Sequence, residues 1–258
     1  MKWVKQRFTF LFKSTKGLIL LGIALAAIIA AFFGLLSGPM ADWGVKDLVV
    51  RIFNINLVEA EREGRLITLY HVIAMIVIAV ETYMITGLLP MKENHKLIIN
   101  STITVGYLTV IFGGLPFAYW GHVWPFHGIY IAGLSLIFFA GCVLLFALWP
   151  WRKEYYVTDN SYAHTRKGVN LERVAFFVMG SATVISALFG AIPGSYFGNG
   201  FTVFLAENVV RAPHKSILDL SIIGHLHIML ALIAICCALI IGRWMDFKGI
   251  WQKLAMPL

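Results

Sequence analysis

The chain has 258 residues, of which 59% are hydrophobic and 13% are charged, and its mean hydropathy is +0.80. This composition excludes an ordinary soluble domain and predicts an all-α, polytopic membrane protein. The formal net charge of +8 requires no nucleic-acid partner, because a basic cytoplasmic face beside anionic membrane lipid is sufficient cause.

Apolar runs of about 20 residues predict six transmembrane helices, which form a single domain over residues 1–258. After the first span, the segment 45–53 has apolar residues at helical spacing with charged residues between them. It predicts a short amphipathic helix on the outer face or, as an alternative, an ordinary packed loop helix. The six predicted spans are 18–36, 66–89, 97–117, 128–149, 174–192 and 218–242.

The distribution of basic residues predicts the orientation of the chain. The first apolar run is longer than the core of a signal peptide, so it is expected to stay as the first helix. Most Lys and Arg residues fall in the segments 1–17, 90–96, 150–173 and 243–258, which an even number of spans places on one side. The positive-inside rule then predicts a multi-pass protein of the inner (cytoplasmic) membrane with both termini in the cytoplasm.

The histidines within the spans indicate a cofactor site near the outer face. His71 lies about one turn inside the second span, His225 and His227 lie about two turns inside the sixth, and His127 opens the fourth. Haem iron needs axial ligands at matching heights on facing helices, whereas scattered core histidines have no reason to share a depth. The alternatives are a hydrogen-bonding strut for His71 and an interfacial anchor for His127.

The two histidines of the sixth span are two positions apart. Successive helical residues rotate by about 100°, so these side chains face nearly opposite sides of the helix. One helix could therefore serve two cofactors.

Glu81 is a carboxylate deep in the second span, roughly 15 Å from His71 toward the cytoplasm. It predicts a proton path or a quinone site, and the alternative is an uncharged glutamate bonded to a neighbouring helix. Cys142, Cys236 and Cys237 also lie within spans and are expected to be small buried apolar residues. The absence of a CxxCH sequence excludes covalent c-type haem on this chain.

Two segments resemble a known family. Residues 65–71, RLITLYH, resemble the second helix of haem-copper oxidases and nitric oxide reductases, where a histidine near the outer end ligates the low-spin haem. Residues 214–229 resemble the late helix of those enzymes, in which the first histidine of HxH ligates the high-spin haem and the second the low-spin haem. The resemblance implies that His71 and His227 are the axial ligands of one haem b. It also implies that His225 reaches a second haem or metal from the opposite side of the helix. The depth of His127, rather than the resemblance, makes it a candidate second ligand at that site. Catalytic subunits of the family have twice as many helices and further metal-binding histidines, so the resemblance implies a reduced six-helix relative.

We therefore expect a membrane b-type cytochrome subunit with one or two haem b groups. It would transfer electrons between the quinone pool and an outer-face redox partner, either a partner subunit or cytochrome c, which would dock on the outer loops 41–64 and 194–216. One alternative is a terminal reductase of dioxygen or nitric oxide, which requires a five-coordinate haem. Another is a non-redox transporter or metal-handling protein whose histidines bind copper, zinc or protons.

Overall fold

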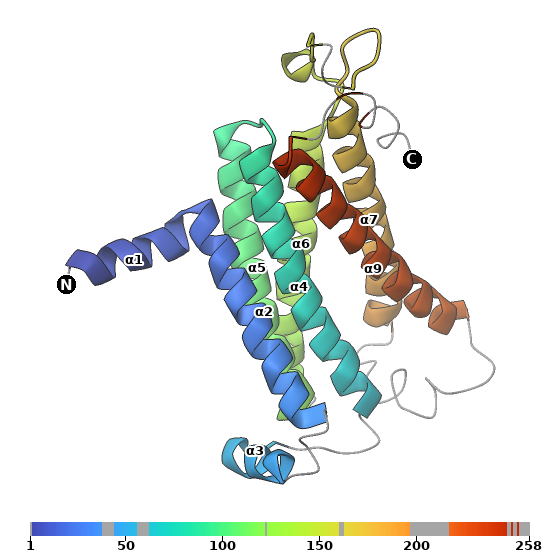
Figure 1. Cartoon of the computed structure of the whole chain (residues 1–258). Coiled ribbons are helices and arrows are strands. Elements are labelled where there is room, and N and C mark those ends of the chain that lie inside the picture. The colour runs from blue at the N-terminus through green and yellow to red at the C-terminus, as the bar shows by residue number, and fades with distance from the viewer. Residues whose placement is uncertain are drawn as a thin grey trace.

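The structure is a computed structural model that describes residues 2–37, 44–55, 62–121, 123–159, 163–196 and 217–246, together with Gly249 and Gln252. Within these residues, six helices are long and apolar enough to cross a membrane, which confirms the predicted all-α polytopic membrane protein (Figure 1). Each of them overlaps one predicted span. They are α2 (Thr15–Ser37), α4 (Arg62–Leu88), α5 (Glu93–Tyr119), α6 (Trp124–Leu148), α7 (Leu171–Tyr196) and α9 (Ile217–Trp244).

Three shorter helices complete the described structure: α1 (Lys2–Lys13), α3 (Val45–Phe53) and the 3-10 turn η3 (Lys153–Tyr155). The helix α3 confirms the prediction for residues 45–53. Val49 is buried while the charged residues Asp47 and Arg51 are exposed, so the helix is amphipathic. The indole Nε1 of Trp120, just after α5, donates a hydrogen bond of 2.6 Å to the carbonyl oxygen of Phe53. The helix α1 was not among the predicted elements.

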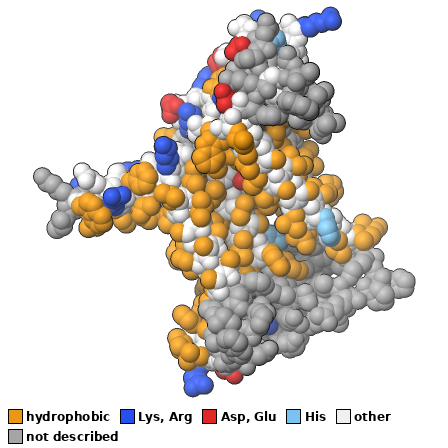
Figure 2. Space-filling model, viewed as in Figure 1, with side chains coloured by type: hydrophobic (Ala, Val, Ile, Leu, Met, Phe, Trp, Pro, Cys, Tyr) orange, Lys and Arg blue, Asp and Glu red, His pale blue; other side chains and the backbone are white. Residues whose placement is uncertain are grey.

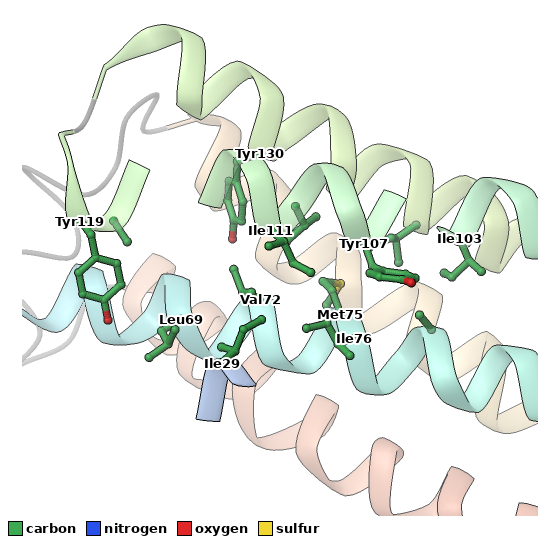
Figure 3. Packing of buried hydrophobic residues seen from close by; sticks show 14 of the residues in the cluster. Ile29, Leu69, Val72, Met75, Ile76, Ile103, Tyr107, Ile111, Tyr119 and Tyr130 are labelled. Atoms are coloured by element: carbon green, nitrogen blue, oxygen red, sulfur yellow. The ribbon is translucent and has the colours of Figure 1, made fainter. Parts of the chain in front are cut away.

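The helices α5 and α6 approach each other closely because glycines line their contact. A Cβ atom on Gly133 would lie 2.6 Å from the backbone nitrogen of Val110 and 2.9 Å from the carbonyl oxygen of Gly106. Small residues allow this kind of close backbone packing between helices in a membrane. In the layer beside this contact, Val72 of α4 lies opposite Ile111 of α5, and Met75 of α4 lies opposite Tyr107 of α5 (Figure 3).

The helix α9 packs against α7 and α4 and runs obliquely across α7 (Figure 1). Leu232, Cys236 and Ile240 are buried in a cluster with residues of α4, α6 and α7. Leu226 and Leu230, in contrast, are exposed. One side of α9 thus packs on the bundle, and the other presents an apolar surface suited to lipid.

Arg173 joins three helices at the end of the bundle where α7 begins. Its side chain is buried. Its Nη1 donates to the carbonyl oxygen of Pro90 at 2.8 Å, and its Nη2 donates to the carbonyl oxygen of Ala147. The guanidinium carbon lies 3.7 Å from the ring centroid of Tyr155. The charge is therefore satisfied by backbone carbonyls at the ends of α4 and α6, which fixes these helices relative to α7.

Candidate histidine site between α4, α7 and α9

The imidazole rings of His71 and His225 lie together where α9 packs against α4. Their ring centroids are 6.2 Å apart, and the ring planes are inclined by 16°. Both side chains are partly buried. Two facing helices therefore place a pair of nearly parallel imidazoles at one height in the bundle, as the depth of these residues in their spans predicted.

A backbone carbonyl holds the Nδ1 atom of each ring. The Nδ1 of His71 lies 3.1 Å from the carbonyl oxygen of Ile67, one turn earlier in α4. The Nδ1 of His225 lies 2.8 Å from the carbonyl oxygen of Ser186 in α7. A carbonyl accepts but does not donate, so each Nδ1 carries the proton and each Nε2 keeps its lone pair. Ring orientation by a backbone carbonyl is typical of histidines that ligate a metal.

The helix α7 forms a close support for the His225 ring. A Cβ atom on Gly190 would lie 2.8 Å from both Nε2 and Cδ2 of His225. Only glycine lets the ring lie this close to α7 while its Nδ1 bonds Ser186, one turn earlier. His225 is thus the residue that links two helices, whereas the described bond of His71 stays within its own helix.

His127 does not lie next to the His71 and His225 pair. Its ring packs on Phe117, with centroids 4.9 Å apart and planes 10° apart. The ring of Phe117 lies 6.3 Å from that of Tyr130, which lies 6.5 Å from that of His71. Two aromatic rings therefore stand between His127 and the pair.

His227 is exposed on the surface of α9, and its Nδ1 lies 2.8 Å from the carbonyl oxygen of Ile223 in the same helix. His225 faces α4 and α7 instead, so the structure confirms that the two histidines of α9 point in different directions. It brings His71 together with His225. The pairing of His71 with His227, which the family resemblance implies, stays a prediction.

Glu81 is buried in α4 and is bonded to α9. The thiol of Cys237 donates to its Oε1 at 3.1 Å. A hydrogen bond from Glu81 to a neighbouring helix is what the alternative interpretation of this residue, a structural contact instead of a proton path or quinone site, predicted. The expectation that all three cysteines are buried was wrong for Cys142 and Cys237, which are exposed, and right for Cys236.

Sequence reasoning did not identify the α7 residues of the site. Ser186 and Gly190 are four positions apart, and this small-xxx-small spacing marks close helix contacts in membranes. That spacing was the available signal. His122 and His214, which fall in predicted loops, lie outside the described residues, as do residues 41–43, 56–61 and 197–216 of the predicted docking loops.

Together, the fold and the site define a multi-pass, all-α membrane protein in which two histidine rings from different helices lie side by side. Across the described part of the chain, no three His, Cys, Asp or Glu side chains group as ligands for a metal ion. Comparisons with protein-family models, with curated proteins and with solved structures found no match.

Proposed function

We propose that the protein is a membrane b-type cytochrome subunit in which His71 and His225 bind the iron of a haem b. The observation that carries this proposal is the pair of nearly parallel imidazoles on two helices, 6.2 Å apart at their centres. Metal–imidazole bonds of about 2 Å on both sides of one iron separate the ring centres by about 6 Å. A porphyrin supplies the other nitrogen ligands, so two histidines suit a six-coordinate haem.

The surroundings of the two histidines support the same proposal. The carbonyl groups of Ile67 and Ser186 orient the rings and leave each Nε2 free to ligate. The buried ring of Tyr130 stands edge-on beside His71 and helps to exclude water. A bound haem supplies one-electron chemistry, while the protein fixes the ligands and the polarity around them.

The likeness of segments 65–71 and 214–229 to haem-copper oxidases and nitric oxide reductases also supports haem. It differs from the geometry on one residue, because it assigns His227 rather than His225 to the haem of His71. We follow the geometry. His227 is exposed on α9, where a side chain of a partner subunit could complete a second haem or metal site.

In this proposal the chain carries electrons between quinone and a redox partner, a subunit or cytochrome c, on the side of the membrane nearer the histidines. That side is the outer one if the basic residues set the topology, with both termini in the cytoplasm. Glu81 lies ten residues from His71 along α4, roughly 15 Å deeper, and could exchange a proton when the haem changes charge.

The test is a dithionite-reduced minus oxidised optical spectrum of the purified protein and of three variants, with pyridine haemochrome quantitation. We expect a b-type spectrum that is lost in His71→Ala and in His225→Ala and kept in His127→Ala. Absence of haem from the unmutated protein would overturn the proposal and favour a metal-handling or transport function.

Two further outcomes separate the alternatives. A spectrum that survives His225→Ala but disappears in His227→Ala would support the ligand assignment that the family resemblance implies. A carbon monoxide response of the unmutated protein would indicate a five-coordinate haem and favour the terminal gas reductase.

A further inference from the structure

We propose that α1 binds the anionic lipid of the membrane leaflet at the end of the bundle where α2 begins. Figure 1 shows α1 projecting away from the bundle at a steep angle to α2. Nearly all of its side chains are exposed, including Trp3 at 66% and Phe8 at 63%. The helix therefore has an apolar surface that the bundle does not cover.

The angle between α1 and α2 is built into the chain by a serine and a glycine. The Oγ of Ser14 donates to the carbonyl oxygen of Phe10 at 2.7 Å and accepts a bond of 3.0 Å from the backbone nitrogen of Gly17. Ser14 thus caps α2 while it closes α1. A Cβ atom on Gly17 would clash with the carbonyl of Phe10 and would lie 2.6 Å from the Cα of Leu11. These contacts hold α1 at a fixed angle to α2, and we call the turn at Ser14 to Gly17 the elbow.

The elbow sets the level of α1 relative to the membrane. The apolar span of α2 begins within a few residues of Ser14, so α1 lies where α2 enters the hydrocarbon. A helix held there at a steep angle to a spanning helix runs along the membrane surface. Interfacial helices of this kind bury an apolar face at the boundary between headgroups and acyl chains.

The residues of α1 form an apolar side with a basic edge, as a helix at the membrane surface requires. Val4, Phe8 and Phe12 follow one another at four-residue spacing, and the rings of Phe8 and Phe12 are 4.5 Å apart. Lys5 and Lys13, eight residues apart, lie along one edge of this apolar stripe. Figure 2 shows hydrophobic and basic side chains together along this projecting helix.

Charge identifies the lipid. No acidic residue precedes Asp42 in the sequence, whereas several basic residues do. The guanidinium of Arg7 lies 5.3 Å from the ring centroid of Trp3, so this cation accompanies an aromatic ring of the apolar half. A basic stripe next to an apolar face complements phospholipids with anionic headgroups, and such lipids are always adjacent to a helix joined to a membrane span.

The test compares tryptic cleavage after Arg7 in the full chain reconstituted into nanodiscs of two compositions. One contains phosphatidylcholine alone, and the other contains phosphatidylcholine mixed with phosphatidylglycerol. Cleavage after the exposed Arg166, in the loop before α7, is measured in the same samples as an internal reference. Relative to that reference, we expect cleavage after Arg7 to be about tenfold slower with phosphatidylglycerol, because several basic residues act together.

Two variants separate charge from other causes. The double variant Lys5→Gln with Lys13→Gln should lose the protection. A matched double variant at two other exposed lysines, Lys92→Gln with Lys153→Gln, should keep it. Equal cleavage rates in the two lipid mixtures would overturn the proposal. Protection that persists in the Lys5 and Lys13 variant would overturn the role of charge.

Discussion

Gly190→Ala perturbs the candidate haem site without substituting either histidine. The new Cβ atom would lie 2.8 Å from Nε2 and Cδ2 of His225, whereas carbon atoms pack at about 3.5 to 4 Å. The ring must therefore move away from α7 by several tenths of an ångström. That movement weakens the bond of 2.8 Å between its Nδ1 and the carbonyl oxygen of Ser186. Loss of such a partner typically lowers the metal affinity of a ligating histidine by about 10- to 100-fold.

The assay is a haem titration of the purified variants, read from the reduced-minus-oxidised spectrum. Gly224→Ala is the matched control, because Gly224 precedes His225 in the same helix and an added Cβ would meet no atom within 4 Å. Both changes add one methyl group within a helix, so their effects on helix propensity are similar. We expect weaker haem binding in Gly190→Ala only. Equal affinities in the two variants would refute the role assigned to the contact between α7 and His225.

Three further predictions concern packing, charge and proton exchange. Gly113→Ala should lower the free energy of unfolding by about 1 to 3 kcal/mol, because its Cβ would lie 2.9 Å from the Cα of Tyr130. Gly87→Ala, whose nearest neighbour would be 3.7 Å away, should have the same melting temperature in detergent as the unmutated protein. Arg173→Ala should lower the melting temperature in detergent, because it removes charged hydrogen bonds to two carbonyls, each worth about 1.5 to 3 kcal/mol. An unchanged melting temperature would contradict the role of Arg173 in fixing α4 and α6 relative to α7. Glu81→Gln keeps the shape of the side chain but cannot exchange a proton, so redox titration should show a haem potential that depends less on pH, and an unchanged slope would exclude Glu81 as the coupled group.

The spanning helices were predictable because a membrane requires about 20 consecutive apolar residues, and each predicted span overlaps a helix of the structure. The helix over 45–53 was predictable from its spacing alone. The helix α1 was missed because a search for long apolar runs passes over a short amphipathic segment. Its signal was present in the sequence, as basic Lys5 and Lys13 alternate with apolar residues at helical spacing.

The candidate site was predictable in its depth but not in its contacts. The positions of His71, His225 and His227 along their spans fix their heights, and the two-residue spacing separates His225 from His227 around α9. Which of the two meets His71 depends on how α9 is rotated and how it crosses α4, and local sequence does not determine either. The support from Ser186 on α7 depends on the same non-local packing.

The most direct test of the central claim, that His71 and His225 together ligate haem iron, is low-temperature electron paramagnetic resonance of the oxidised protein. If both rings ligate one iron, imidazole planes only 16° apart would donate into the same iron d orbital and so would separate the two π-type orbitals in energy. The account predicts a rhombic low-spin ferric signal that is absent from His225→Ala, the variant expected to lose its haem. A purely high-spin signal from the unmutated protein, or a low-spin signal that His225→Ala leaves unchanged, would contradict it.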